Sequence, residues 1–127
     1  MPVWLAVVMG GAGGSLARFG FVLAGRRLFG PLFPWGTLAV NLLGSFLIGV
    51  IWGYFFDRPA APEWLRVGLM TGVMGGFTTL SSVSLETTLL AESGALGPAL
   101  LNFAGNTFLG VLACVVGLAL ARSWFAA

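Results

Sequence analysis

Residues 74–87 read MGGFTTLSSVSLET, and this polar stretch lies inside one of the long apolar segments of the chain. It opens with Gly75 and Gly76, near the middle of that segment, and continues with a series of hydroxyl residues. Glycine and threonine are poor helix formers, and a backbone group freed from a helix in lipid must be satisfied by protein, water or an ion. We therefore expect this helix to break at the glycine pair. A kink that serves packing alone is the alternative.

The residues that follow the glycine pair carry hydroxyl groups that can donate hydrogen bonds to an anion. Backbone carbonyls exposed where a membrane helix is broken are in turn a known way to hold Na⁺. A break followed by hydroxyl groups therefore favours an ion pathway over a packing feature. The hydroxyl residues that we assign to this candidate pathway are Thr79, Ser81, Ser82 and Ser84.

The composition places the chain in a membrane. Of its 127 residues, 58% are hydrophobic and only 8% are charged, with a mean hydropathy of +1.00, whereas a soluble domain has about a quarter charged residues. The length allows one domain, residues 1–127, and the net charge of +2 is too small for a nucleic-acid-binding surface. The single cysteine excludes a disulfide framework, and the absence of histidine removes the usual parts of metalloenzymes and catalytic triads. We therefore expect a protein that is not an enzyme.

Four segments are long and apolar enough to cross a bilayer, which needs about 20 such residues per helix. They cover about residues 3–25, 33–56, 64–90 and 98–121, and the short loops between them contain Pro or Gly. Tryptophan and tyrosine gather towards the ends of these segments, as in the aromatic belts of membrane proteins. The chain is therefore expected to be an all-α protein with four transmembrane helices, multi-pass in the inner (plasma) membrane of the cell.

The arginines that set membrane orientation are nearly balanced between the two sides. Arg58, Arg66 and Arg122 fall on one side, and Arg26 and Arg27 on the other. Because the positive-inside rule depends on a bias that is almost absent here, the chain can insert in both orientations and pair with its own inverted copy. The alternative is that the Arg26–Arg27 pair sets a single orientation.

Small and polar residues recur every four positions in three of the segments, which keeps them on one helix face. In the second segment such a face can line a water-filled path or form a packing seam, and Gly49-x-x-x-Gly53 allows close helix approach. In the fourth, two amides one turn apart are hard to explain by packing alone. In the third, the glycines at positions 68, 72 and 76 favour packing. The polar members of these faces are Thr37, Asn41, Ser45, Asn102 and Asn106.

Apart from Arg66, which lies at the very start of the third segment, two charged residues lie inside the segments. A central arginine costs roughly 2.5–3.5 kcal/mol on insertion scales, so Arg18 should face protein or water. It can attract an anion towards an aqueous vestibule, form an ion pair or snorkel to the interface. Glu86 is a candidate partner for it.

At these residues the chain resembles the Fluc/CrcB family of fluoride channels over essentially its whole length. The matching stretches are GGAGGSLARF in the first segment, GTLAVNLLGSFLIG in the second and GGFTTLSSVSLET in the third. The resemblance implies an antiparallel, dual-topology homodimer with two pores and passive export of fluoride. It also implies a structural Na⁺ at the dimer interface, held by the backbone carbonyls of Gly75 and Thr78 from both subunits. Asn41 matches the asparagine on the pore side, and Arg18 matches the arginine of the first helix.

Fluoride suits such a lining because it is small and strongly hydrated, and close N–H and O–H donors must replace its water. The match departs from the family at the Phe-x-x-Phe pair that usually follows the two threonines, where this chain has Leu80 and Val83. The fourth segment has Asn102 and Asn106 where the family often has Tyr and Ser. The chain is then either a non-conducting or heterodimeric subunit of such a channel, or a variant pore that relies on asparagine donors.

A small multidrug transporter would also have four short helices and dual topology. It needs a membrane-embedded carboxylate in its first helix to couple protons, and the first segment here has only Arg18. A purely structural membrane subunit would explain the small-residue faces but not the amides and hydroxyls.

Overall fold

The structure, a computed structural model, describes residues 1–125, and these form four helical rods without a strand. The predicted all-α fold is therefore confirmed, and each rod occupies one of the four predicted segments. Each of the last two rods includes a π-helical turn (η1 or η2). The elements are α1 (Val3–Phe29), α2 (Trp35–Phe56), α3 (Glu63–Val67), η1 (Gly68–Val73), α4 (Met74–Phe77), α5 (Leu80–Glu92), α6 (Leu96–Ala104), η2 (Gly105–Leu109) and α7 (Gly110–Phe125).

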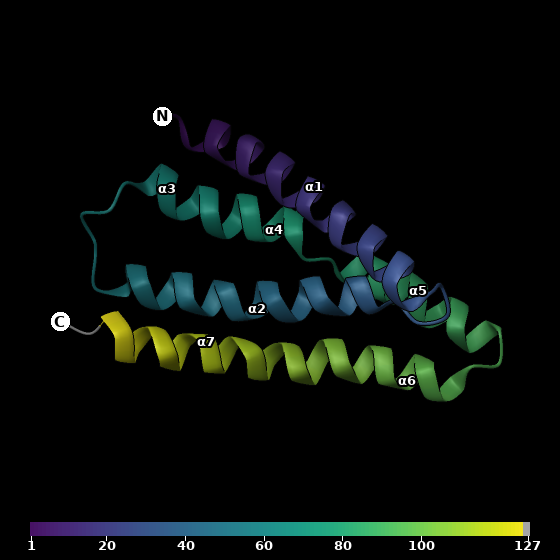
Figure 1. The fold of residues 1–127 in the computed structure, drawn as a ribbon. Helices are drawn as coiled ribbons and strands as arrows, with labels where there is room; N and C mark the ends of the chain where they lie inside the picture. Colours follow the sequence, from purple (N-terminus) through teal and green to yellow (C-terminus); the bar gives the residue numbers. More distant parts are fainter. Residues whose placement is uncertain (126–127) are drawn as a thin grey trace.

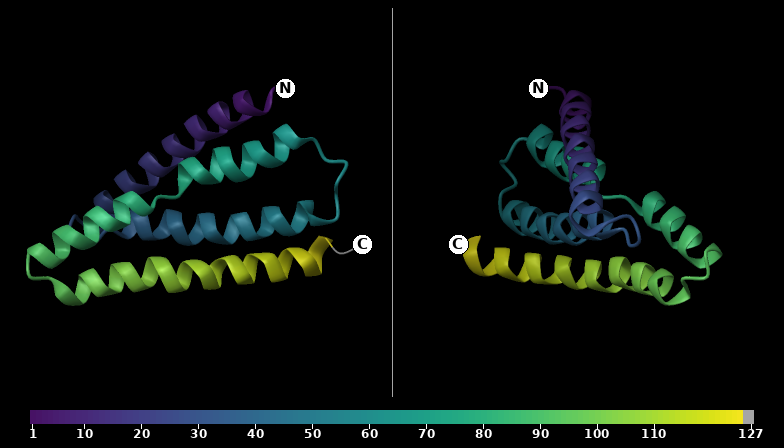
Figure 2. Two further views of the ribbon diagram at one scale, coloured as in Figure 1. Left: turned by 180° about the vertical axis from the view of Figure 1, so that it is seen from behind. Right: turned by 45° about the vertical axis from the view of Figure 1, so that its right-hand side comes forward.

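The rods alternate in direction, so that α1 begins and α7 ends at the same end of the molecule (Figure 1). The α2 helix and the last rod lie side by side along their whole length, while α1 crosses the bundle obliquely over α4 (Figures 1 and 2). Within residues 1–125, three helices are long and apolar enough to cross a membrane, namely Val3–Phe29, Trp35–Phe56 and Leu96–Phe125. The third predicted segment is divided into shorter helices.

Backbone geometry divides the third rod at Thr78 and Thr79. Both residues are extended, with φ/ψ of −91°/158° and −154°/122°, between the end of α4 at Phe77 and the start of α5 at Leu80. Gly75 and Gly76 lie within α4, so the glycine pair at which we expected the break is helical instead. Gly76 is used for packing: a side-chain carbon there would lie 2.5 Å from the Gly11 carbonyl oxygen of α1.

Close contact between glycine faces holds the rods together. A side-chain carbon at Gly49 would collide with the Cys114 carbonyl of α7, and one at Gly53 would lie 2.6 Å from the Ala121 Cβ. On the other seam, a carbon at Gly68 would lie 3.0 Å from the Ala6 Cβ of α1. The packing roles predicted for Gly49-x-x-x-Gly53 and for the third-segment glycines are confirmed. These contacts replace side-chain interdigitation, as is common where membrane helices approach closely.

Candidate functional site

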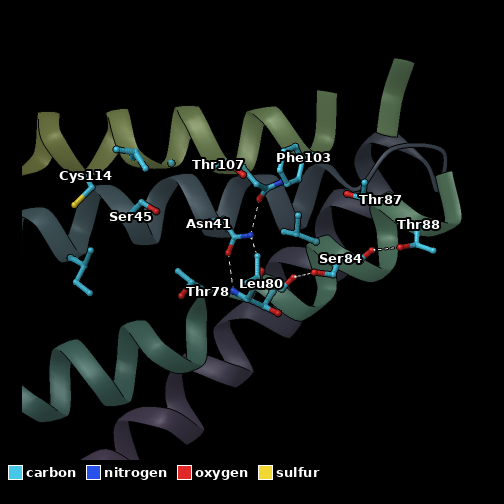
Figure 3. Close-up of a pocket in the computed structure, with 16 residues that line it drawn as sticks. Asn41, Ser45, Thr78, Leu80, Ser84, Thr87, Thr88, Phe103, Thr107 and Cys114 are labelled. Carbon is cyan, nitrogen blue, oxygen red and sulfur yellow. Dashed lines mark hydrogen bonds between the residues drawn. The ribbon is translucent and has the colours of Figure 1, made fainter. Parts of the chain in front are cut away.

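A cavity of about 630 Å³ lies between α2, α5 and the last rod, next to the extended residues Thr78 and Thr79 (Figure 3). The predicted site residues Asn41, Ser45, Thr79, Leu80, Val83, Ser84 and Asn106 line it. Ionised residues are absent from its lining within the described chain. Prediction missed three threonines that also line it, Thr87, Thr88 and Thr107. A signal for Thr87 was present, because it follows Val83 by four residues and so shares its helix face.

Asn41 binds the extended backbone next to the cavity. Its Oδ1 accepts from the Thr79 N–H (2.8 Å), and its Nδ2 donates to the Thr79 carbonyl (3.0 Å). The same Nδ2 also donates to Asn106 Oδ1 at 2.7 Å, so both of its protons have protein acceptors. The amide therefore pairs with Thr79 much as a neighbouring strand would, and it fixes the backbone where the helix is interrupted (Figure 3).

The predicted amides of the fourth segment continue this network away from α2. Asn106 Nδ2 donates to the Asn102 carbonyl (2.8 Å) and to Asn102 Oδ1 (3.0 Å). Asn102 is fully buried and donates from Nδ2 to Thr87 Oγ1 on α5 at 3.0 Å. The π-helical turn η2 begins at Gly105, beside Asn106, and such turns are often found at functional sites. The three asparagines thus form one line of hydrogen bonds. It runs from Thr79 in the third rod to Asn41 on α2, then to Asn106 and Asn102 in the last rod, and returns to the third rod at Thr87 of α5.

The hydroxyl residues of α5 mostly bond within their own segment. Thr79 caps the helix, since its Oγ1 accepts from the Ser82 N–H at 3.2 Å and lies 3.2 Å from the hydroxyls of Ser81 and Ser82. Ser84 donates to the Leu80 carbonyl at 3.0 Å. Ser81 and Ser82 do not line the cavity, whereas Thr79 and Ser84 do.

Leu80 and Val83, which occupy the positions of the missing phenylalanine pair, differ in their surroundings. Leu80 is 79% exposed at the first turn of α5, whereas Val83 is only 3% exposed. Both line the cavity. Within a single chain, a larger side chain at Leu80 therefore has open space, whereas one at Val83 could extend only towards the cavity.

Arg18 lies outside this cavity and binds the third rod instead. Its Nε donates to the Gly76 carbonyl of α4 at 3.0 Å. The half-buried Arg18 guanidinium gains a charge-assisted bond, and the carbonyl near the end of α4 gains a donor. Of the alternatives for Arg18, the structure thus shows a contact with protein that is not an ion pair.

Glu86 is not the partner of Arg18. It lines a second cavity, of about 370 Å³, together with Arg26 and Thr37, at the α1–α2 loop. The Thr37 hydroxyl donates to Glu86 Oε1 at 2.8 Å, while Oε2 is buried with no hydrogen-bond partner in the described chain. The spacing of residues along a helix could not show that the Glu86 carboxylate would meet Thr37 of α2.

The carbonyls of Gly75 and Thr78 lose the donors that a continuous helix would give them. The N–H four residues after Gly75 is that of Thr79, and it bonds Asn41. The N–H four residues after Thr78 is that of Ser82, and it bonds the Thr79 hydroxyl. Gly75 is itself exposed, with no atom within 4 Å of a side-chain carbon built on it. These carbonyls are chemically suited to a hard cation.

Comparison with known proteins assigns the family. Residues 5–118 match the family model described as CrcB-like protein, Camphor Resistance (CrcB). The chain belongs to the CrcB family. It is 46% identical to a fluoride-specific ion channel FluC of Agrobacterium fabrum, covering 94% of this chain and 95% of that protein. It is 45% identical to a FluC channel of Magnetococcus marinus, covering 91% and 94%, and 43% identical to one of Sorangium cellulosum, covering 96% of each chain.

Membership in the CrcB family confirms the resemblance found in the sequence. The family consists of ion channels and not of enzymes. With its long apolar helices, the chain is a multi-pass integral membrane protein.

Proposed function

We propose that this protein is a fluoride-specific channel that lets fluoride leave the cell passively and so relieves its toxicity. The observation that carries the proposal is identity of 42–46% over more than nine-tenths of the chain to relatives that are named as such channels. The cavity beside α5 supports it, because its polar lining is made of amides and hydroxyls, without a carboxylate that would repel an anion.

The decisive test uses this chain alone in liposomes loaded with potassium fluoride or potassium chloride. With valinomycin present to balance charge, fluoride should appear outside within the assay while chloride stays inside. Empty liposomes supply the baseline. A homogeneous preparation that passes no fluoride would refute the homomeric channel, and recovery of flux with a second CrcB chain from the same cell would support the heterodimeric alternative. Equal flux of both anions would contradict selectivity.

Two copies in antiparallel orientation form the channel in this proposal. The nearly even split of arginines between the two sides supports insertion in both orientations. Leu80 and Gly75 also leave an open surface around the interruption in the third rod. A second copy placed there would cover the cavity and bring two interruptions together.

A structural Na⁺ held between the two copies completes the proposal. The carbonyls of Gly75 and Thr78 would hold it, because their helical donors are directed to Asn41 and to the Thr79 hydroxyl. The ion would supply fixed positive charge that ties the two copies together. The chain's own part is to keep these carbonyls free of internal donors.

The Gly75→Val variant tests the interface and the ion site together. A side-chain carbon at Gly75 would have no contact within 4 Å in the described part of the chain, so the variant should fold but lose dimers and dependence on sodium. The matched control is Gly20→Val on α1, since Gly20 is equally free of neighbours within 4 Å. Size-exclusion chromatography in sodium and in N-methylglucamine buffers is the measurement. Dimers of Gly75→Val that match those of Gly20→Val in both buffers would exclude this interface.

A further inference from the structure

The hydroxyl groups on the cavity differ in whether their protons are already used. Thr78 donates to the Met74 carbonyl (2.9 Å), Ser84 to the Leu80 carbonyl (3.0 Å) and Thr88 to the Ser84 carbonyl (2.8 Å). Each follows the usual pattern for a hydroxyl in a helix, which donates to the carbonyl four residues earlier. Thr87 breaks this pattern, because its Oγ1 accepts from Asn102 Nδ2. Its proton has no acceptor among the described residues. The same is true of the Ser45 and Thr107 hydroxyls, which also line the cavity, but only Thr87 accepts from an amide as well.

Two backbone groups fix which side-chain atom of each asparagine donates and which accepts, because an N–H can only donate and a carbonyl can only accept. The Thr79 N–H can only donate, so the atom of Asn41 that it meets must be Oδ1. The Asn102 carbonyl can only accept, so the atom of Asn106 that it meets must be Nδ2. The remaining bonds then follow: Asn41 donates to Asn106, Asn106 to Asn102, and Asn102 to Thr87. Every amide along this line is oriented the same way.

This direction decides which groups remain for an anion. Both Nδ2 protons of Asn41 and both of Asn106 already have protein acceptors, and Asn102 is 0% exposed. Asn41 and Asn106 can donate to an ion only by giving up one of these bonds, and Asn102 is kept from an ion by its burial. The line ends at Thr87, a half-buried residue that lines the cavity. In Figure 3, Thr87 lies on the side of α5 nearer to Phe103, and Thr88 lies farther from Phe103.

We propose that the Thr87 hydroxyl is an anion-contacting donor of this cavity, and that the line of three asparagines orients it. Because successive hydrogen bonds polarise one another, a hydroxyl that accepts from the end of such a line is a stronger donor than an isolated one. The ligand is a small anion that accepts strongly. Its identity as fluoride rests on the proposed function.

Threonine-to-valine substitution at neighbouring positions tests the assignment. Thr87→Val removes the donor at the end of the asparagine line at nearly constant shape, whereas Thr88→Val removes a hydroxyl that is bonded within its own helix. In the liposome assay, Thr87→Val should lower fluoride efflux about tenfold or more, equivalent to about 1.4 kcal/mol. Thr88 also lines the cavity, but because its proton is already used, Thr88→Val should lower efflux clearly less than Thr87→Val. Thr87→Ser keeps the hydroxyl and should recover most of the efflux.

Binding provides a second readout that does not require conduction. Line broadening of the ¹⁹F signal of sodium fluoride, titrated against the purified protein in detergent, should be present for the unmodified chain and for Thr88→Val but reduced for Thr87→Val. Thr87→Ala replaces Thr87→Val if the latter does not elute as a single species. Unchanged efflux and binding in the Thr87 variants, or equal losses in Thr88→Val, would overturn the assignment. An unmodified chain that neither binds nor passes fluoride would refute the proposed function, and the assignment with it.

Discussion

The Asn41 amide bonds three groups of the protein at once, which sets what a change at this single residue will do. It pairs with both backbone groups of Thr79 and with the side chain of Asn106. Its neighbour in the network, Asn102, is fully buried. A buried polar group that loses its partner costs about 1–3 kcal/mol, and a charged one more. Substitutions in this network should therefore affect folding as well as conduction.

Asn41→Asp keeps the shape of the side chain but replaces two donors with an acceptor. The carboxylate would face the Thr79 carbonyl and Asn106 Oδ1, which both accept hydrogen bonds. We expect fluoride efflux to fall by orders of magnitude and the yield of folded protein to fall with it, by roughly 1–3 kcal/mol of stability. Thermal unfolding in detergent measures the second effect, with the exposed Ser81→Ala as control. Lost efflux at normal stability would instead indicate direct contact between Asn41 and the ion.

Restoring the phenylalanine pair tests the two departing positions separately. An aromatic edge carries partial positive charge and can contact a partly dehydrated anion. Leu80→Phe should be tolerated and should raise efflux, because the Leu80 side chain is 79% exposed. Val83→Phe should destabilise the chain by about 1–3 kcal/mol, because Val83 is 3% exposed and a ring there must displace its neighbours or enter the cavity. The double variant then shows whether the gain survives the strain. Rapid, selective efflux by the unmodified chain, with no gain in Leu80→Phe, would show that the rings are dispensable.

Much of the site could be predicted residue by residue, but not its internal bonds. The spacing of four in the second and fourth segments predicts that Asn41, Asn102 and Asn106 face polar surroundings, and all three join one network. Spacing fixes the face of a helix but not its height against a neighbour, so it could not show that these amides bond one another. For the same reason it could not pair Glu86 with Thr37.

At the level of elements, composition predicts the four rods well and the interruption of the third less well. Apolar length sets where a rod runs, and glycine faces set where rods touch, so both can be read from the sequence. The position of the interruption depends on tertiary bonds. Gly75 and Gly76 stay helical, and the extended residues are those whose backbone meets Asn41. Intrinsic helix propensity predicts the interruption at the glycines, but hydrogen bonds from Asn41 of α2, far away in the sequence, place it at Thr78 and Thr79.

The seam between α2 and α7 gives a prediction at the same level. Gly49→Ala places a carbon against the Cys114 carbonyl, where backbone must move. We expect the two helices to separate and the yield of folded protein to fall, at a cost of about 1–3 kcal/mol. Gly20→Ala, with nothing within 4 Å, is the matched control and should be neutral or slightly stabilising. Thermal unfolding of both variants in detergent is the measurement. Equal stability of the two variants would show that this close approach is not needed.

For the whole molecule, the even number of rods and the distribution of charge together determine how the chain is oriented in the membrane. The α1 helix begins and the last rod ends at one end of the molecule, so both termini share a side of the membrane whichever way the chain inserts (Figure 1). Arg58, Arg66 and Arg122 belong to that side, and Arg26 and Arg27 to the other. A difference of one arginine is small against the bias that fixes orientation in most multi-pass proteins. Orientation should therefore respond strongly to few added charges.

Two lysines added before Met1 should fix one orientation and so remove antiparallel pairs. Fluoride efflux from cells that express only this variant should fall to the level of cells without the protein. A second variant, with two lysines in the loop of residues 30–34, should insert the opposite way and be equally inactive alone. Co-expression of the two should restore efflux, because each supplies the orientation that the other lacks, and this recovery separates a topological defect from a folding defect. Labelling of a cysteine placed at the N-terminus, in a Cys114→Ala background, reports orientation directly. If the unmodified chain is labelled from one side only, antiparallel self-pairing is excluded, and the chain must then work with a different subunit.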